Sequence, residues 1–218
     1  HFDLAFKNQT LPAVLNNLLG MGQVSSALAA AAVASHLGMS AEEIISKLAE
    51  LKGQAGRMRP IAGIKGSLLL DDSYNAAPAS MRFAIQELAR FSLADNTRRI
   101  VALGSMGELG DLSEQEHRLI GLQLGEIGAD LIVTVGEKVK DIRSGAIEAG
   151  IPESQTHHFE TSVEAGRFLD GEVNKGDIVL IKGSQSARME KVAKDLMAEP
   201  NRASELLVRQ YGKWVVDY

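Results

Sequence analysis

Residues 99–135 read RIVALGSMGELGDLSEQEHRLIGLQLGEIGADLIVTV, and this stretch decides the fold of the larger part of the chain. Two apolar runs, Arg99 to Leu103 and Leu131 to Val135, each lead into a glycine and are typical of short buried strands. Between them, a serine with a glutamate three residues later is typical of a capping box and predicts a helix from Ser113 to about Ile127. Continuous apolar strands joined by a helix of this length indicate parallel strands that are covered on both faces.

The same alternation extends over the rest of the chain from Gly56 onward. Apolar runs and helical periodicity predict strands at Ser67–Leu70, Thr156–Phe159 and Ile178–Ile181, and helices at Pro78–Phe91, Glu137–Ala149, Ser162–Leu169 and Ala187–Met197. We therefore predict an α/β fold with a mostly parallel sheet and helices on both faces. The tail from Pro200 to Tyr218 is less regular, and we expect an ordered extension with no catalytic role.

The first 55 residues have a different pattern. An alanine-rich segment predicts a helix over Gln23–Leu37, and Ser40 with Glu43 predicts a capping box that opens a second helix to about Leu51. Two helices with an irregular lead-in bury too little surface to form an independent core. We therefore expect residues 1–55 to be the end of a larger domain and residues 56–218 to be the α/β domain. Because the chain begins with His1 rather than methionine, we also expect sequence upstream of it.

Composition excludes several classes of function. The formal net charge of −5 argues against binding to nucleic acid or to an anionic membrane, both of which need a basic face. No run of about 18 apolar residues predicts a membrane span. The chain has no cysteine, which excludes disulfides, thiolate catalysis and cysteine-ligated zinc. We expect a reducing compartment, and thus a cytoplasmic location.

Polar residues gather where three of the predicted strands end. These segments read DDSYNAAP at 71–78, GSMGELG at 104–110 and KGSQSARME at 182–190. Ligands of open α/β sheets bind outside the carboxyl ends of the strands, so the three segments predict one site.

Each candidate residue also has a purely structural interpretation. Asp72 is able to accept hydrogen bonds from two hydroxyls, as a ribose offers, and is equally suited to capping a turn. Lys182 and the residues that follow it could bind a carboxylate or phosphate, or form a solvated loop. Arg57 could reach a phosphate from the linker between the two parts of the chain, or be solvated there.

Other chemistries have no pattern in this sequence. The five histidines have no metal-ligand spacing, so we predict no metal site, and His117 is more typical of a residue that braces a loop than of a base. No Gly-x-Ser-x-Gly motif, catalytic triad or Gly-x-x-x-x-Gly-Lys-Ser/Thr phosphate loop occurs, and we predict no catalytic residue within this chain.

The three polar segments resemble the Mur ligase family. DDSYNAAPASM at 71–81 resembles the family stretch DDSYNANPxSM, LGSMGELG at 103–110 resembles LGDMxELG, and KGSQSARME at 182–190 resembles KGSxxxxME. Gly56 and Arg57 resemble the pair that opens the C-terminal domain of the family. The resemblance covers the chain apart from its tail, and within the family it is strongest to the branch that uses D-alanyl-D-alanine.

The resemblance implies a three-domain, ATP-dependent peptidoglycan ligase. ATP would phosphorylate the carboxylate of a UDP-MurNAc-tripeptide, and the amine of D-alanyl-D-alanine would then displace phosphate. Residues 1–55 would be the C-terminal end of the central ATP-binding domain, and residues 56–218 the Rossmann-like Mur ligase C-terminal domain. ATP and Mg²⁺ would be held mainly by the missing upstream domain, so this chain alone would be inactive.

The resemblance also implies roles for individual residues. On the nucleotide side it implies contacts of Arg57 with phosphate, Asp72 with the ribose hydroxyls, and Tyr74 and Asn75 with the cleft. Near the incoming D-alanyl-D-alanine it implies Lys182, Gly183 and Ser184.

The sequence departs from the family pattern at several positions. Ala77 stands where the family has asparagine, Ser105 where it has aspartate, and Gly22, Gln23 and Ser26 replace a histidine and two asparagines. Two alternatives therefore stay open: another Mur-type amino-acid ligase, or a non-catalytic module that binds a nucleotide or a partner. Tyr74 favours the D-alanyl-D-alanine branch, since other branches tend to have lysine at that position.

Overall fold

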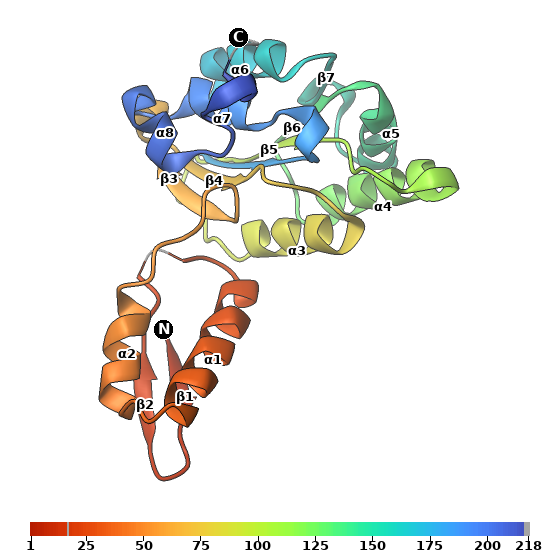
Figure 1. The fold of residues 1–218 in the computed structure, drawn as a ribbon. Coiled ribbons are helices and arrows are strands. Elements are labelled where there is room, and N and C mark those ends of the chain that lie inside the picture. The colour runs from red at the N-terminus through yellow and green to blue at the C-terminus, as the bar shows by residue number, and fades with distance from the viewer. Residues whose placement is uncertain (17, 216–218) are drawn as a thin grey trace. The chain divides into compact units, whose positions relative to one another are not determined.

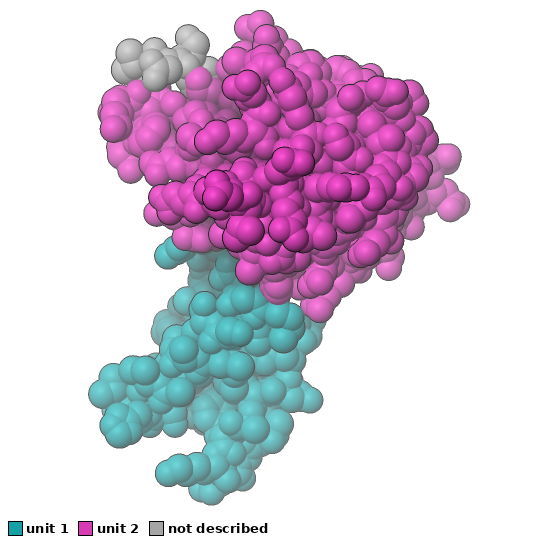
Figure 2. Space-filling view, turned by 90° about the vertical axis from the view of Figure 1, so that its right-hand side faces the viewer, with its two compact units in different colours: residues 1–54 teal, residues 55–218 magenta. Residues whose placement is uncertain are grey.

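The computed structural model describes residues 1–16 and 18–215. It divides into two compact units, residues 1–54 and residues 55–218, which Figure 2 shows in different colours. No helix in these described residues is long and apolar enough to cross a membrane.

The first unit combines a hairpin with two helices. Its elements are β1 (Phe2–Ala5), antiparallel β2 (Thr10–Ala13), α1 (Met21–His36) and α2 (Ala41–Ala49). The predicted capping box is confirmed, since Glu43 donates its amide to the Ser40 hydroxyl at 3.2 Å and accepts the Ser40 amide at 2.9 Å. A small core of Leu4, Ala13, Ala27, Ala31, Ile44 and Leu48 holds the unit together.

The second unit is built on a six-stranded sheet in the order β3-β4-β8-β5-β6-β7 (Figure 1). Its strands are β3 (Arg59–Ala62), β4 (Leu68–Asp72), β5 (Arg99–Gly104), β6 (Leu131–Val135), β7 (Thr156–Phe159) and β8 (Ile178–Lys182). All neighbours pair in parallel except β3 and β4. The residues of β6 and β8 are all buried, as expected for strands covered on both faces.

Helices cover both faces of this sheet. Figure 1 shows α3 (Pro78–Ala89) and α4 (Ser113–Glu126) on one face, and α6 (Ser162–Glu172) and α7 (Glu190–Leu196) on the other. Helix α5 (Lys140–Glu148) packs against α4. The predicted α/β fold, a mostly parallel sheet with helices on both faces, is therefore confirmed.

Short elements complete the unit. The 3₁₀ turns are η1 (Ile64–Gly66), η2 (Gly110–Leu112), η3 (Glu137–Val139), η4 (Glu153–Gln155), η5 (Gln185–Ala187), η6 (Pro200–Arg202) and η7 (Gly212–Trp214). In the tail, α8 (Ala203–Leu206) is followed by a segment that lies against the domain, with Leu206 and Leu207 in the main core.

Three local predictions are wrong. The lead-in to α1 is not irregular, because it contains the β1–β2 hairpin. A strand, β3, occupies the edge of the sheet where none was predicted. Ser113 does not cap α4: turn η2 starts the helical path earlier, and the Ser113 side chain faces His117 instead of the free amides of the helix.

The order of strands creates a crevice at β8. This strand lies between β4 and β5, and its following helix, α7, covers the face opposite to α3 and α4. Loops that leave adjacent parallel strands toward opposite faces leave an opening at the carboxyl edge of the sheet. The loops that follow β4, β5 and β8 border a cavity at this edge, through Asn75, Gly107 and Ser184.

Candidate functional site

The strand register brings the three polar segments together. Asp72 at the end of β4 pairs with Lys182 at the end of β8, and Leu103 of β5 pairs with the other side of Lys182. Just beyond, the Ser184 amide donates to the Ser105 carbonyl at 2.8 Å. Residues more than a hundred positions apart thus share one edge of the sheet.

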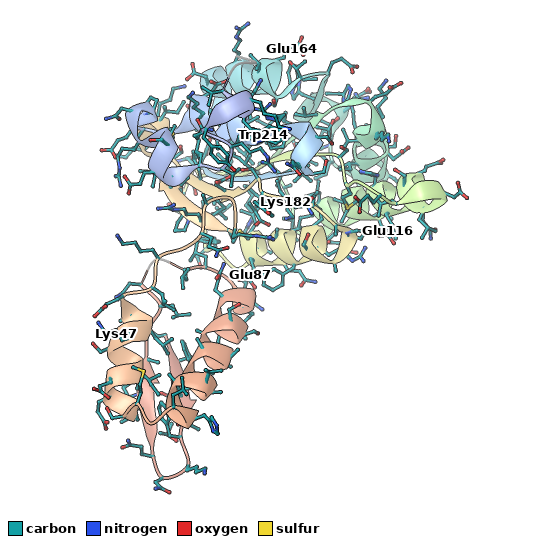
Figure 3. The ribbon with its side chains drawn as sticks, viewed as in Figure 1. Lys47, Glu87, Glu116, Glu164, Lys182 and Trp214 are labelled. Atoms are coloured by element: carbon teal, nitrogen blue, oxygen red, sulfur yellow. The ribbon has the colours of Figure 1, made fainter. Side chains whose placement is uncertain are left out.

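Two of the predicted site residues form an ion pair with each other. The Lys182 ammonium lies 2.6 Å from Asp72 Oδ2 and also donates to the Asn75 carbonyl at 2.9 Å. Only 2% of the lysine side chain is exposed, and Figure 3 labels it. Asp72 Oδ1 accepts the Met58 amide at 3.0 Å. Burial raises the pKa of Asp72, while the ammonium and the amide oppose that shift.

The neighbouring carboxylate, Asp71, anchors the start of the domain. It is fully buried and accepts the Gly56 amide at 3.0 Å and the Ser73 amide at 3.2 Å. Burial raises the pKa of Asp71 to about 6 despite these hydrogen bonds, and the charge of Asp72 adds to the shift. We did not single out Asp71 from the sequence, although two adjacent aspartates at a strand end were a signal.

Gly56 must be glycine for a steric reason. Its φ is +69°, and a Cβ at this position would lie 2.8 Å from the Tyr74 amide nitrogen. That amide donates to the Gly56 carbonyl at 3.1 Å, so Gly56 is held from both sides. The next residue, Arg57, is placed by this turn over the Tyr74 ring, with Cζ 4.3 Å from the ring centroid.

Gly183 and Ser184 form the turn that follows β8. A Cβ on Gly183 would lie 2.7 Å from Met189 Cγ and 3.0 Å from Gly104 Cα, so the strand ends of β5 and β8 meet too closely for a side chain. The Ser184 hydroxyl is buried and lies 3.0 Å from the Ser186 hydroxyl and 3.3 Å from that of Ser105.

Two cavities open beside these residues. One, of about 800 Å³, is bordered by Gly107, Glu108, Ser184 and Arg188, and the other, of about 650 Å³, by Tyr74, Arg209 and Tyr211. Both are also bordered by Asn75, Gln185 and Trp214. Their sizes suit small organic ligands. Asn75 and Ser184, which were expected on different ligands, therefore line the same cavity.

The glycine-rich loop after β5 is braced by His117. Its Nε2 accepts the Met106 amide at 3.0 Å, and its Nδ1 lies 2.7 Å from the Ser113 carbonyl. Accepting on one nitrogen and donating from the other requires the neutral ring with its proton on Nδ1. His117 is completely buried, and its two hydrogen bonds tie the loop after β5 to the start of α4. Its predicted bracing role is therefore confirmed.

The tail contributes residues that sequence reasoning missed. The Arg209 guanidinium is buried and donates to the Ser73 carbonyl at 3.1 Å and to the Tyr74 carbonyl. Arg188 and Trp214 also face the cavities. No local pattern marks an arginine in a tail as a partner of a loop 136 positions earlier.

Polar, charged and aromatic side chains border the two cavities. They include carboxylate, amide and aromatic groups, with arginines beside them. Among residues 1–16 and 18–215, no group of three His, Cys, Asp or Glu is placed to hold a metal ion.

The chain is similar in sequence and fold to known proteins. A UDP-N-acetylmuramoyl-tripeptide–D-alanyl-D-alanine ligase of Bacillus subtilis is 31% identical over 183 residues, covering 84% of this chain and 39% of the relative. The enzyme of the same name from Escherichia coli is 35% identical over 185 residues, covering 84% and 38%. A crystal structure of MurF from Acinetobacter baumannii superposes with a TM-score of 0.77 at 34% identity, covering 89% of this chain and 41% of that one.

The chain thus spans about two-fifths of the length of the curated relatives that it matches. The model of the Mur ligase glutamate ligase domain matches residues 56–185, which include the first two polar segments of the site and the start of the third, residues 182–185. By this match, the chain belongs to the Mur ligase family.

Proposed function

We propose that this chain is the C-terminal portion of an ATP-dependent ligase that joins D-alanyl-D-alanine to a UDP-MurNAc-tripeptide through an acyl phosphate. The observation that carries the proposal is the meeting of three family motifs at the β8 crevice, in a chain 31–35% identical to ligases of that name. We also propose that residues 1–55 are the end of a central ATP-binding domain and residues 56–218 the C-terminal domain. The division into residues 1–54 and 55–218 supports that boundary.

The nucleotide would be contacted by Arg57, Asp72, Tyr74 and Asn75. Arg57 lies on the face of the Tyr74 ring and presents a guanidinium to a phosphate approaching from solvent. Asp72 retains free lone pairs beside its bonds to Lys182 and Met58, because a carboxylate has about four acceptor positions. Because 14% of its side chain is exposed, Asp72 could therefore accept a hydrogen bond from a ribose hydroxyl.

The amine donor would lie beside Lys182, Gly183 and Ser184. The Lys182 ammonium already donates to Asp72 and to the Asn75 carbonyl. It would therefore attract the carboxylate of the dipeptide through its positive charge, without a direct hydrogen bond. Ser184 borders the larger cavity and offers a hydroxyl to the carboxylate of the dipeptide.

ATP would supply the phosphoryl group that activates the substrate carboxylate, and Mg²⁺ would accompany its phosphates. No phosphate loop occurs in these 218 residues, so the triphosphate and the metal would be held by another part of the enzyme. The chain alone would then be inactive. A nucleotide-dependent reaction on a UDP-linked precursor also supports a cytoplasmic location.

Phosphate release by the ligase that carries this chain tests the proposal. We expect release to require ATP, UDP-MurNAc-tripeptide and D-alanyl-D-alanine together, with the mass of the tripeptide precursor increased by that of the dipeptide less one water. Release that depends on a single amino acid in place of the dipeptide would assign the chain to another branch of the family. If no amine is ligated, the remaining interpretation is a non-catalytic module that binds a nucleotide or a partner.

Two substitutions test the assignment of residues to ligands. Tyr74→Leu should chiefly raise the KM for ATP. Ser184→Ala should raise the KM for D-alanyl-D-alanine by about 10- to 100-fold, since it removes one hydrogen bond to a charged carboxylate. Ser144→Ala, on the exposed side of α5, is the matched control and should change neither KM. If Ser184→Ala alters only the KM for ATP, the assignment of the β8 loop is wrong.

A further inference from the structure

After α8 the tail continues as residues 207–215, which lie outside the segment 56–185 that matches the family model. One side chain of this stretch, that of Arg209, is only 6% exposed. Nη1 donates to the Ser73 carbonyl at 3.1 Å, and Nη2 donates to the Tyr74 carbonyl. The planar fork of a guanidinium can bind two successive carbonyls in this way, whereas a lysine ammonium has no such geometry.

The same guanidinium is held by a buried carboxylate. Arg209 Nη1 lies 3.2 Å from Glu190 Oε2, and the other oxygen of Glu190 accepts Nε of Arg188. Glu190 is completely buried at the start of α7, directly after the β8 loop. The cluster Arg188–Glu190–Arg209 therefore links the loop after β8 to the loop after β4 by way of the tail.

Both arginines have unusual backbone conformations. Their φ angles are +54° for Arg188 and +57° for Arg209, in the left-handed region. Side chains with a Cβ adopt this region at a cost, and they keep it where surrounding contacts impose it. Because both left-handed arginines pair with the same carboxylate, that of Glu190, we infer that these contacts hold the backbone of the tail in its path.

Trp214 extends the link to the cavities. Its carbonyl accepts Nη2 of Arg188 at 2.7 Å, and its ring centroid lies 5.0 Å from Arg188 Cζ and 5.8 Å from Arg209 Cζ. The side chain borders both cavities and is labelled in Figure 3. The tail is thus a wall of the candidate site.

We propose that Arg209 is a positioning residue, which fixes the Ser73–Tyr74 segment against the β8 loop and so sets the nucleotide side of the site. This proposal rests on the function proposed above. It adds a positioning role to a tail that was expected to be an ordered extension with no catalytic role. Arg209 would act through the backbone of Ser73 and Tyr74 without touching a ligand.

Hydrogen exchange in the 218-residue chain tests the link itself, without any assay of activity. Arg209→Lys keeps the charge beside Glu190 but cannot bind both carbonyls. We expect faster exchange in peptides that cover residues 73–76, and stronger acrylamide quenching of Trp214, the single tryptophan of the chain. Arg202→Lys, whose side chain is exposed and pairs with Glu199 and Glu205, is the matched control and should change neither.

Kinetics of the ligase that carries this chain test the positioning role. Arg209→Lys should raise the KM for ATP at least 5-fold and leave the KM for UDP-MurNAc-tripeptide unchanged. Thermal unfolding shows whether the lysine variant is folded. If it is not, Arg209→Gln, which can still donate to one carbonyl, takes its place.

The outcomes separate the two proposals. Unchanged exchange at residues 73–76 overturns the link. Faster exchange with a lower kcat and an unchanged KM for ATP overturns the positioning role, because it indicates only loss of folded enzyme. A wild-type ligase that fails to use ATP and D-alanyl-D-alanine overturns the proposed function and, with it, positioning for that reaction, while faster exchange would still support the link.

Discussion

The Lys182 ammonium lies 2.6 Å from the Asp72 carboxylate and joins two positions that are 110 residues apart in sequence. The two residues are also register partners at the ends of adjacent parallel strands. Because Lys182 donates as well to the Asn75 carbonyl, one buried cation holds the loop after β4 from two sides. The loops after β4 and β8, which we assign to different ligands, are therefore coupled, and a substitution in one should also alter the conformation of the other.

Removing the cation alone should be costly. Lys182→Met leaves the Asp72 carboxylate largely buried without its partner, and we expect a loss of about 3–5 kcal/mol in the free energy of unfolding. The double variant Lys182→Met/Asp72→Asn should lose less than the sum of the two single losses. Urea unfolding followed by Trp214 fluorescence measures this for the second unit.

An exposed pair provides the control for that experiment. Lys47 and Glu50 lie 2.8 Å apart, but about two-thirds of each side chain is exposed. Lys47→Met should therefore change the stability of its own unit by less than about 1 kcal/mol. Additive losses at Lys182 and Asp72 would mean that their proximity contributes no coupling energy.

Gly56 should tolerate a methyl group poorly. Gly56→Ala introduces both a left-handed alanine and a Cβ 2.8 Å from the Tyr74 amide nitrogen. Gly128→Ala is the matched control, since its φ is +62° and no atom lies within 4 Å of the added Cβ. Both variants should lose about 1 kcal/mol to backbone strain, and Gly56→Ala a further 1–3 kcal/mol to overpacking.

Equal losses in the two glycine variants, measured by thermal unfolding of the second unit, would contradict this account of Gly56. They would show that the turn before Arg57 can shift away from Tyr74, and that the motif is not held as tightly as its hydrogen bonds indicate.

The sheet could be predicted because its central strands are continuous apolar runs that end at glycines or charged residues. The strands that were missed, β1, β2 and β3, have another character, because each is only four residues long. Two of them, β2 and β3, also contain a proline, Pro12 and Pro60, which argues against a strand in a sequence. Each lies at the edge of a sheet, which is where proline is tolerated in strands.

The candidate site could be predicted only in part. The rule that ligands bind at the carboxyl ends of parallel strands indicated which loops would meet. It could not indicate that β8 is inserted between β4 and β5, and it is this insertion that places Lys182 against Asp72. Arg209 was missed because its partners are backbone carbonyls, which have no signature in the side-chain pattern.

Stability should depend on pH through Asp71. Its pKa of about 6 in the folded protein exceeds the ordinary value of 3.8, so the folded state keeps its proton to higher pH than the unfolded chain does. Between about pH 4 and pH 6 the folded state binds more protons, and stability therefore falls as the pH rises, then levels off. The two-unit difference corresponds to a loss of about 3 kcal/mol.

Asp71→Asn isolates that contribution. The amide cannot ionise, so the stability advantage of the wild type over the variant should be largest near pH 4 and should shrink by up to about 3 kcal/mol by pH 7. Urea unfolding at several pH values measures the difference. A constant difference across this range would mean that Asp71 is ionised in the folded protein at pH 4.

The 218-residue chain should bind Mg-ATP no more tightly than the millimolar range and hydrolyse none. A triphosphate needs a cradle of amides, a lysine and a metal, and the sequence has no Gly-x-x-x-x-Gly-Lys-Ser/Thr motif to supply it. Whatever binding remains should come from the nucleoside side, where Tyr74 and Asn75 border a cavity, and from the single guanidinium of Arg57. Adenosine should then bind within about 10-fold of ATP in calorimetry, and Tyr74→Leu should weaken both. Micromolar affinity for Mg-ATP, worth about 8 kcal/mol, that disappears with adenosine would place a phosphate cradle inside this chain and refute the division of the nucleotide between two parts of the enzyme.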